Sequence, residues 1–335
     1  MMNVAINQIR GHSGVDVWAE NLCRGLQNAG VSCTTHLLPS YYQFFPDLMV
    51  FRKKNGVDAD VIQSHTWNGF CFKGSVPLVV TEHGILQDPA LNPYKTWGQK
   101  LYHQYVFRME KKSLAAADAV VCVSEYTRKK MLEIFGFAET HVIYNGIDTD
   151  KFRPAQVPDS MDSSDPGKII LLFTGNLTLF KGADLLPKIM DLLDDRFILL
   201  MAHGFKQSMK ISHKRIIDMG HIPQSMMADT YNRSDILLAP TRVEGFGLSV
   251  AEAMACGKPV VATNGSSLPE LVIDGKGGFL CQMNDVRDYT EKIRYLADNE
   301  IERKKMGEFN RHRVIEKFEL RVMAKAYSAL YRNLL

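Results

Sequence analysis

Two glutamates eight positions apart, Glu244 and Glu252, form the clearest group of residues in the chain that could do chemistry. They lie in the sequence P-T-R-V-E-G-F-G-L-S-V-A-E-A-M-A-C-G-K-P, directly after an apolar run typical of a buried strand. Gly245 and Gly247 allow the backbone to turn tightly and to approach a ligand closely. A helix that begins near Leu248 would present free N–H groups, which bind anions such as phosphate.

The two carboxylates suit different parts of such a ligand. Glu252 falls about one turn inside the expected helix, where a carboxylate can accept two hydrogen bonds from a cis-diol such as a ribose. Glu244, on the loop, could instead contact a transferred sugar. Paired glutamates on a helix often form only a solvated face, but residues 249–255 are otherwise small and apolar. Glu252 is therefore the exception on a face that should pack against a sheet.

This segment resembles the nucleotide-sugar signature of the retaining glycosyltransferases of family 4, which is E-G-x-G, a helix, and a second Glu eight residues after the first. The resemblance extends along essentially the whole chain. The other matching motifs are, in order, Ser13-Gly14, Glu82-His83-Gly84, Val123-Ser124-Glu125, Asn145-Gly146-Ile147-Asp148, Gly175 and Lys181-Gly182. The resemblance implies the GT-B fold, in which two Rossmann-like domains face each other across a cleft. The C-terminal domain would then bind most of the nucleotide and the N-terminal domain the acceptor.

The resemblance also implies a role for each matched residue in the second half of the chain. Glu252 would hold the ribose, and Glu244 would hold the region of the donor sugar. Lys181 would pair with the diphosphate, where a cation stabilises the charge that develops on the leaving group. A plain surface lysine before a helix is the alternative for Lys181. The backbone amides that would bind sugar hydroxyls or phosphates are those of Phe246, Gly247 and Leu248.

Two motifs in the first half would complete the site. By the resemblance His83, in the turn T-E-H-G after a strand, would contact the donor sugar, although a lone histidine is more often structural. Gly14 matches the second glycine of the family's Gly-Gly loop, with Ser13 in place of the first and Asp16 where an acidic residue commonly follows. That loop would allow close approach of the acceptor or the diphosphate. An ordinary helix-start turn capped by Asp16 is the alternative.

One position departs from the family pattern. The family usually has arginine directly after the glycine of the Gly175 loop, where this sequence has Asn176. Either Asn176 contributes a neutral donor to the diphosphate, or a cation elsewhere takes over the contact. The candidates for that cation are Arg242, Lys258 and Lys206.

Composition and spacing argue against other classes of protein. The chain has 40 Lys and Arg against 37 Asp and Glu, a net charge of +3, so nucleic acid is not expected as a partner. The six cysteines include no CxxC pair, which favours buried, reduced thiols. The strings Asp58-Ala59-Asp60 and Asp148-Thr149-Asp150 are interpreted as turns, so we expect no metal and no other cofactor. A nicotinamide-dependent oxidoreductase would need G-x-G-x-x-G after the first strand, and Gly11-His12-Ser13-Gly14 has the wrong spacing.

Short β-branched runs alternate with longer helical patterns throughout, which predicts an α/β protein with two parallel sheets. A stretch rich in Pro, Ser and Asp, 153–168, is typical of a linker. We therefore expect an N-terminal Rossmann-like acceptor domain at 1–155 and a C-terminal donor domain at 168–315. By the resemblance the last helix, 316–335, returns to cover the N-terminal domain. The expected strands are 2–9, 32–38, 61–63, 78–81, 119–123 and 141–143 in the first half, and 169–174, 197–201, 216–219, 236–239 and 260–263 in the second.

The resemblance implies that the chain is a retaining, metal-independent hexosyltransferase. It would move a sugar from a nucleoside diphosphate sugar, UDP slightly preferred over GDP, to a glycan, lipid-linked or small-molecule acceptor. The acceptor would attack on the same face from which the diphosphate departs. A nucleotide-sugar epimerase on the same fold and a nucleotide-sugar-binding protein with a decayed site remain as alternatives.

The start of the chain lacks a cationic segment before its apolar run, and no run of eighteen apolar residues occurs, so we expect a cytoplasmic protein. Peripheral contact with the inner membrane face is a lesser alternative. It would use the aromatic residues Tyr41, Tyr42, Phe44 and Phe45 and the basic run 52–54, which could equally be core and a solvated edge. The expected helix 94–117 is also rich in Lys and Arg, but residues 1–156 as a whole hold sixteen Lys and Arg against fourteen Asp and Glu.

Overall fold

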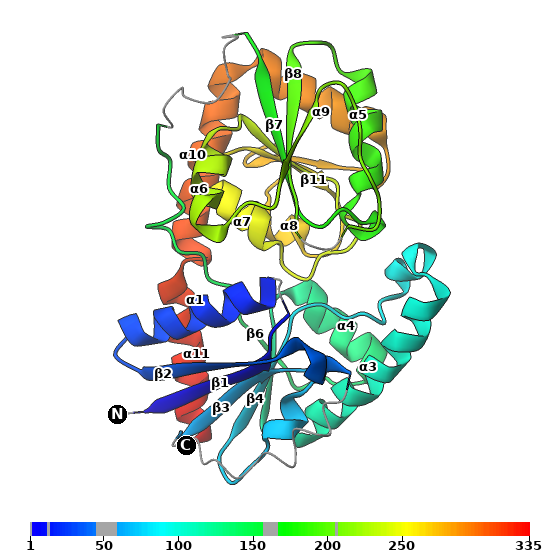
Figure 1. Cartoon of the computed structure of the whole chain (residues 1–335). Helices are drawn as coiled ribbons and strands as arrows, with labels where there is room; N and C mark the ends of the chain where they lie inside the picture. Colours follow the sequence, from blue (N-terminus) through cyan, green and yellow to red (C-terminus); the bar gives the residue numbers. More distant parts are fainter. Residues whose placement is uncertain (1, 12–13, 45–58, 157–166, 205–206) are drawn as a thin grey trace. The chain divides into compact units, whose positions relative to one another are not determined.

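The computed structural model describes residues 2–11, 14–44, 59–156, 167–204 and 207–335, and the chain divides into two compact units (Figure 1). Unit 1 comprises residues 1–146 and 318–335, and unit 2 comprises residues 147–317. Each unit contains one six-stranded parallel sheet. The predicted α/β class with two parallel sheets is therefore confirmed.

The sheet of unit 1 has the strand order β2-β1-β3-β4-β5-β6. Its strands are β1 (Asn3–Ile9), β2 (Ser32–Leu38), β3 (Val61–His65), β4 (Leu78–Glu82), β5 (Ala119–Cys122) and β6 (His141–Val142). The α-helices of this unit are α1 (Gly14–Asn28), α3 (Trp97–Ala116), α4 (Glu125–Phe135) and α11 (Leu320–Leu334). Short 3-10 turns occur at η1 (Ser40–Gln43), η2 (Gly69–Phe72) and η3 (Pro89–Tyr94). The central strands β3 and β4 are buried along their whole length, as expected for parallel strands covered on both faces.

Helices α1 and α11 pack on each other over one face of this sheet. Gly25 permits the close approach, because a Cβ there would lie 3.1 Å from the carbonyl oxygen of Leu320. Two buried tyrosines of α11 also reach the sheet by hydrogen bonds. The Tyr331 hydroxyl donates to Gln63 Oε1 at 2.9 Å, and the Tyr327 hydroxyl lies 2.8 Å from Thr81 Oγ1. The last helix is thus part of the core of unit 1.

Local sequence signals set the ends of the helices on the other face. The expected helix 94–117 begins only at Trp97, because Thr96 and Gln99 form a reciprocal capping box. Ser124 accepts a hydrogen bond from the Thr127 N–H and so caps α4. Gly136 ends α4 in the left-handed conformation, with φ 67°.

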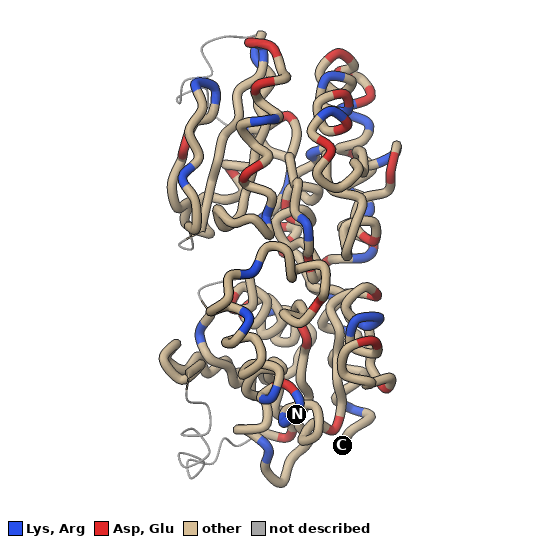
Figure 2. The backbone as a smooth tube through the Cα atoms, turned by 90° about the vertical axis from the view of Figure 1, so that its right-hand side faces the viewer, with Lys and Arg blue, Asp and Glu red and all other residues tan. Residues whose placement is uncertain are grey.

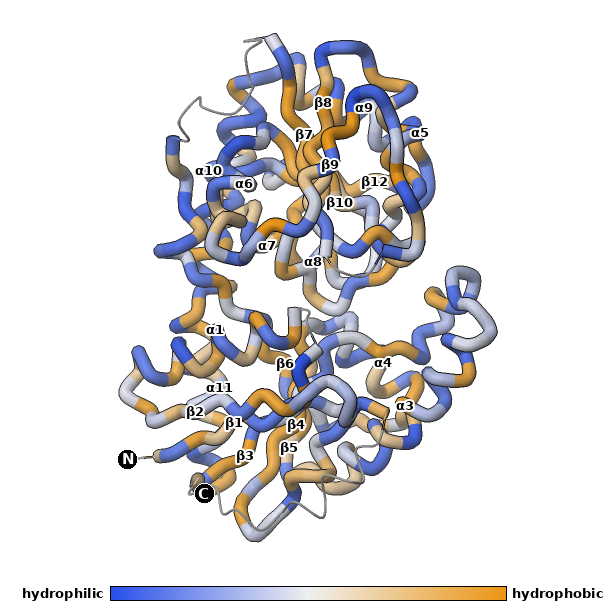
Figure 3. Tube along the Cα trace, viewed as in Figure 1, coloured by the Kyte–Doolittle hydropathy of each residue, from blue (hydrophilic) through white to orange (hydrophobic). Residues whose placement is uncertain are grey.

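The sheet of unit 2 has the strand order β12-β11-β10-β7-β8-β9. Its strands are β7 (Ile169–Thr174), β8 (Phe197–Ala202), β9 (Ile216–Gly220), β10 (Ile236–Ala239), β11 (Val260–Thr263) and β12 (Gly278–Cys281). The α-helices are α5 (Leu186–Leu192), α6 (Met227–Asn232), α7 (Leu248–Ala255), α8 (Leu268–Leu271), α9 (Val286–Asp298) and α10 (Glu300–Lys317), with 3-10 turns at η4 (Leu179–Lys181), η5 (Ala183–Leu185) and η6 (Gln224–Met226). In Figure 3 strands β7 and β8 stand out as hydrophobic. Their side chains form the core together with those of α5 and α9.

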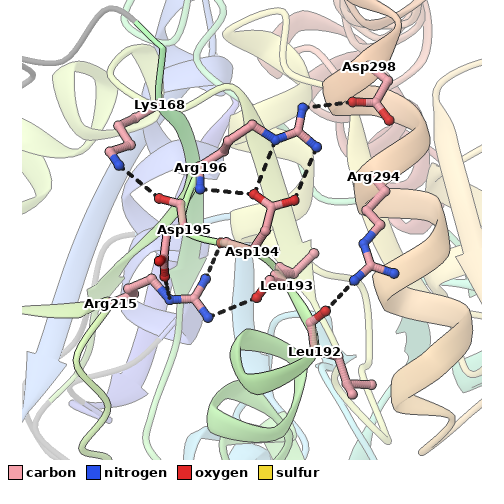
Figure 4. A network of polar contacts seen from close by, with 9 residues as sticks. All are labelled: Lys168, Leu192, Leu193, Asp194, Asp195, Arg196, Arg215, Arg294 and Asp298. Atoms are coloured by element: carbon pink, nitrogen blue, oxygen red, sulfur yellow. Dashed lines mark hydrogen bonds and ion pairs between the residues drawn. The ribbon is translucent and has the colours of Figure 1, made fainter.

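A network of charged side chains lies at the amino-terminal edge of the unit 2 sheet (Figure 4). Arg196, just before β8, donates to Asp194 at 3.1 Å and to Asp298 of α9 at 2.9 Å. Arg215, just before β9, donates to the Leu193 carbonyl at 2.9 Å. Ligands of open α/β sheets bind at the opposite, carboxyl-terminal edge. The network therefore ties helices to strands and is separate from the functional edge.

Strand β12 was not predicted. It is only four residues long and begins with glycine, so its sequence carries little strand signal. Gly278 is required there, because a Cβ would lie 1.9 Å from the Val260 carbonyl oxygen of the neighbouring strand. The expected linker at 153–168 lies largely outside the described residues.

Candidate functional site

The predicted donor residues follow adjacent strands of unit 2. Gly175, Asn176 and Lys181 come after β7, whereas Glu244 and the start of α7 come after β10. Strands β7 and β10 are neighbours in the sheet, and the carboxyl ends of parallel strands meet at one edge. The topology therefore brings the two loops together.

Lys181 and Glu244 form an ion pair between these loops, in which Lys181 Nζ donates to Glu244 Oε2. The turn that carries the lysine is built for this approach. Thr178 caps it by accepting a hydrogen bond from the Lys181 N–H. Gly182 has φ 69°, and a Cβ there would lie 2.1 Å from the Pro240 carbonyl oxygen. Glycine is thus needed for the lysine turn to rest against the end of β10.

Arg242 is not available to replace the missing arginine at position 176. It is only 5 % exposed, and its Nη atoms donate to both oxygens of Asp184 at 2.6 and 2.8 Å. Its Nε donates to Asn284 Oδ1 at 2.8 Å, and Nη1 also donates to the Leu179 carbonyl. The guanidinium therefore holds the lysine turn in place, which corrects the expectation that it could contact a diphosphate.

Lys258, Lys206 and Asn176 were the other candidates for the contact that this arginine would make. Lys258 precedes β11, at the amino-terminal edge of the sheet, and its Nζ donates to the Asn232 carbonyl at 3.0 Å, so it is also ruled out. Lys206 lies outside the described residues. Asn176 points its amide oxygen at Gly204, where a Cβ would lie 2.3 Å away. Of the cations proposed from the sequence, Lys181 is the one that the described part of the chain places beside Glu244.

Two serines clamp the loop that carries Glu244. The Glu244 N–H donates to Ser266 Oγ at 3.0 Å. Ser267 Oγ lies 3.0 Å from the Glu244 carbonyl oxygen and 3.0 Å from that of Phe246, so it can donate to either of them. Ser266 has φ 49°, a left-handed conformation that costs about 1 kcal/mol or more for a residue with a side chain. Neither serine was identified from the sequence, although both follow β11 at the edge of the sheet where the other candidate loops lie.

Glu252 is a buried carboxyl group on α7, only 6 % exposed. The Tyr231 hydroxyl donates to its Oε2 at 2.8 Å and the Gln224 amide to its Oε1 at 3.2 Å. Burial raises the pKa of Glu252 from 4.5 to about 7, against the opposing effect of these two hydrogen bonds. Neither Tyr231 nor Gln224 was identified from the sequence, because nothing in their own neighbourhood marks them.

The helix that carries Glu252 begins as the glycines predicted. Gly247 precedes α7 with φ 102°, and a Cβ would lie 3.1 Å from Leu271. Leu248 is the first helical residue, so the N–H groups of the first turn of α7 have no acceptor within the helix. Phe246 is buried, and Gly245 and Leu248 are partly exposed. The predicted glycine turn leading into a helix is therefore present.

His83 lies in unit 1, directly after β4. Its ring makes an edge contact with Trp18 at 4.5 Å between centroids. Burial, with a smaller contribution from His65, lowers the pKa of His83 to about 3, so the ring is neutral near pH 7. Glu82 fixes the turn by accepting from Thr66 Oγ1 at 2.6 Å and from the Gly84 N–H at 2.8 Å. Among the described residues the buried Nε2 of His83 has no hydrogen-bond partner.

Gly14 is the first residue of α1, and Ser13 lies outside the described residues. Asp16 accepts hydrogen bonds from the Gly11 N–H at 3.0 Å and from Gln8 Nε2 at 3.2 Å. Asp16 thus closes the loop between β1 and α1. The site residues are in consequence divided between the two units, with Gly14 and His83 in unit 1 and the remainder in unit 2.

The described residues contain no cluster of His, Cys, Asp and Glu arranged to hold a metal ion. Asp148 of the second Asp-x-Asp string closes a turn by accepting from the Asp150 and Lys151 N–H groups at 3.2 and 3.0 Å. Asp58 of the first string lies outside the described residues.

Family models match both halves of the chain. The model described as "Glycosyltransferase Family 4" matches residues 31–151, and "Glycosyl transferases group 1" matches residues 162–313. An uncharacterized glycosyltransferase of Methanocaldococcus jannaschii is 30 % identical over 243 residues, which cover 70 % of this chain and 63 % of the relative. An alpha-maltose-1-phosphate synthase of Mycolicibacterium smegmatis is 28 % identical over 313 residues, 83 % of this chain and 80 % of the relative. The match thus spans less than two thirds of the archaeal relative.

Solved structures share the fold over the full length. A sucrose-phosphate synthase from Thermosynechococcus elongatus has a TM-score of 0.84 and 19 % identity, covering 100 % of this chain and 99 % of that one. HepE from Anabaena, in complex with UDP and glucose, has a TM-score of 0.80 and 16 % identity, covering 100 % of both chains. Both likenesses establish the GT-B architecture.

Proposed function

Since the chain belongs to the group 1, family 4 glycosyltransferases of the GT-B fold, we propose that it is a retaining enzyme that needs no metal ion. It transfers a sugar from a nucleoside diphosphate sugar to a hydroxyl group of an acceptor. The observation that carries the proposal is the Lys181–Glu244 ion pair at the edge of the sheet where α7 begins, with the buried Glu252 one turn further along the helix.

The donor would bind in three parts. Its diphosphate would draw Lys181 Nζ away from Glu244 and accept hydrogen bonds from the first N–H groups of α7. The ribose hydroxyls would donate to Glu252, and Glu244, released from the lysine, would accept from the sugar hydroxyls. His83, a neutral imidazole, would contribute a hydrogen bond to the sugar without introducing a charge.

Transfer then requires orientation and stabilisation of charge. The acceptor oxygen bonds to the anomeric carbon on the face from which the diphosphate leaves, and the departing phosphate oxygen takes the acceptor proton. Lys181 and the N–H groups of α7 stabilise the charge on the nucleoside diphosphate. No protein carboxylate acts as a nucleophile, so Glu244 and Glu252 bind and orient the donor.

The donor is proposed to be a UDP-sugar. HepE has been crystallised with UDP and with UDP-glucose, which supports uridine over guanosine for this chain through the shared fold. The acceptor is a glycan, a lipid-linked sugar or a small molecule. It would be bound by unit 1, and transfer to it would place the protein in polysaccharide or glycolipid biosynthesis on the cytoplasmic side of a membrane.

Calorimetric titration of UDP, GDP, ADP and NAD in the presence of EDTA tests the site. We expect one nucleoside diphosphate, UDP, to bind at micromolar concentration. Glu252→Ala should weaken that binding at least tenfold, about 1.4 kcal/mol. Arg24→Ala, an exposed cation of unit 1, is the control and should bind as the wild type. Binding of NAD alone, or of no nucleotide, would refute the proposal.

A further inference from the structure

Helix α3 has an exposed face that the proposed site does not use. Its residues recur at alternating spacings of four and three, which places them on one side of an α-helix. These residues are Trp97, Leu101, Gln104, Arg108 and Lys111, and all five are exposed. Trp97 is 76 % exposed and Leu101 is 54 % exposed, and the two lie one helical turn apart on this face. The opposite side of α3 is buried in unit 1 through His103, Val106, Met109, Glu110, Ser113 and Leu114.

The same face is cationic and has no opposing charge on its own helix. Lys100 and Lys112, also exposed, flank the stripe. Glu110 is the single acidic residue of α3, and it is fully buried. Burial, and the nearby carboxylate of Glu82, hold the pKa of Glu110 well above its ordinary value, so it offers no negative charge at the surface. Helix α3 lies on the right-hand side of unit 1 in Figure 1, the side turned toward the viewer in Figure 2.

Turn η1 extends the apolar part of this face. Phe44 follows η1 and is 53 % exposed, with its ring centroid 6.1 Å from that of Tyr102 in α3. The Tyr105 hydroxyl donates to the Phe44 carbonyl at 3.1 Å, which fixes the turn beside the helix. Tyr41 is exposed on the same turn. The aromatic and basic residues expected to act with them, Phe45 and 52–54, lie outside the described residues.

We propose that this α3 face, defined by Trp97, Leu101, Arg108, Lys111 and Phe44, binds the surface of a bilayer that carries anionic lipids. Trp, Phe and Leu enter the region of the head groups, and the Lys and Arg side chains bind lipid phosphates. Two copies of a cationic face repel each other, which disfavours self-association. A nucleic acid would use the cations but would leave the exposed Trp and Leu in water. Among the described residues no helix is both long and apolar enough to cross a bilayer, so the contact is at the surface.

Flotation of the full chain with vesicles tests the proposal without any nucleotide sugar, so its outcome is separate from that of the proposed function. Vesicles of phosphatidylcholine alone are compared with vesicles that also contain phosphatidylglycerol, at low and high NaCl. Two variants alter the face: Trp97→Ser with Leu101→Ser, and Arg108→Gln with Lys111→Gln. Two controls make the same kinds of change on α10: Ile301→Ser, at an 86 % exposed position, and Lys304→Gln with Lys305→Gln.

We expect binding to the anionic vesicles only, weakened by salt. Each cation removed should reduce the partition coefficient about fivefold, and the apolar double variant should reduce it at least tenfold, with both controls unchanged. Thermal unfolding should match the wild type for every variant, since the altered side chains are exposed. The proposal is overturned by an absence of binding to anionic vesicles, or by equal binding of the α3 variants. It is also overturned by concentration-dependent dimers that the Trp97→Ser, Leu101→Ser variant abolishes, or by binding to a soluble polyanion but not to vesicles.

Discussion

The proposed role of Glu252 needs an ionised carboxylate, whereas burial of this side chain favours its protonated form. Its pKa of about 7 means that burial penalises the ionised form by ~3 kcal/mol relative to the ordinary value of 4.5. A ribose diol donates hydrogen bonds, so the proposed contact needs the ionised carboxylate. Donor binding must therefore compete with protonation of the empty site.

This competition gives a dependence on pH with a definite sign. Below pH 7 the empty site binds a proton that the complex releases, so donor affinity should fall about tenfold per pH unit between pH 7 and 5 and level off above pH 8. A nucleoside diphosphate sugar is the ligand of choice, because it lacks the terminal phosphate group that titrates near 6. His83, with its pKa near 3, contributes nothing in this range.

Glu252→Gln is the matched variant for this prediction, because its amide can still accept from Tyr231. Calorimetry from pH 5 to 8 should show weaker binding and no slope. A wild-type affinity that is flat from pH 5 to 8 would contradict the assignment of Glu252 to the ribose.

The residues that the sequence identified are those whose own motif carries the signal. Glu244, Glu252 and Lys181 are marked by glycine turns and spacing, and the structure places the first and third in an ion pair. Tyr231 and Ser266 act on those glutamates from 21 and 22 positions away in the chain. The sequence shows that Ser266 follows an expected strand, but it does not show that Ser266 or Tyr231 contacts a glutamate, because tertiary packing brings these groups together.

At the scale of elements, the loop after β11 holds the loop after β10. Ser266 has a left-handed backbone conformation, and its hydroxyl accepts a hydrogen bond from the Glu244 N–H. Strain of this kind persists only where the surrounding structure enforces it. We therefore assign Ser266 to positioning Glu244 for the donor sugar.

Two substitutions separate strain from the hydrogen bond. Ser266→Ala removes the hydroxyl and keeps the strain, whereas Ser266→Gly removes both. Both variants should raise the KM for the donor about tenfold, through the lost hydrogen bond to the loop. Chemical denaturation should show Ser266→Gly to be about 1 kcal/mol more stable than Ser266→Ala. If the KM for the donor were unchanged in both variants, Ser266 would not position Glu244 for the donor sugar.

Most of the elements could be predicted because apolar β-branched runs and helical periodicity are local properties. The exceptions depend on contacts between segments that are distant in the sequence. Strand β12 starts at a glycine that the neighbouring backbone demands. Arg242 and Lys258 were considered as substitutes for arginine at 176 because of their charge alone. However, Arg242 is paired with Asp184, and Lys258 lies at the amino-terminal edge of the sheet, opposite the candidate site.

For the whole molecule, the sequence predicted two parallel sheets, and each unit has its own core. The last helix belongs to unit 1, through the hydrogen bonds of Tyr327 and Tyr331 to its sheet. Of the predicted site residues, Gly14 and His83 belong to unit 1, whereas Lys181, Glu244 and Glu252 belong to unit 2.

Sugar transfer can be measured as release of nucleoside diphosphate from UDP-sugars, with EDTA present, across a panel of glycan, lipid-linked and small-molecule acceptors. We expect acceptor-dependent release of UDP by the wild type, with a product that keeps the anomeric configuration of the donor. Lys181→Ala should lower kcat by at least a hundredfold, as expected for loss of charge stabilisation on the leaving group, while Lys188→Ala, an exposed lysine on α5, should act as the wild type. Inverted products, a requirement for a divalent metal ion, or full activity of Lys181→Ala would contradict the proposed retaining, metal-independent transfer.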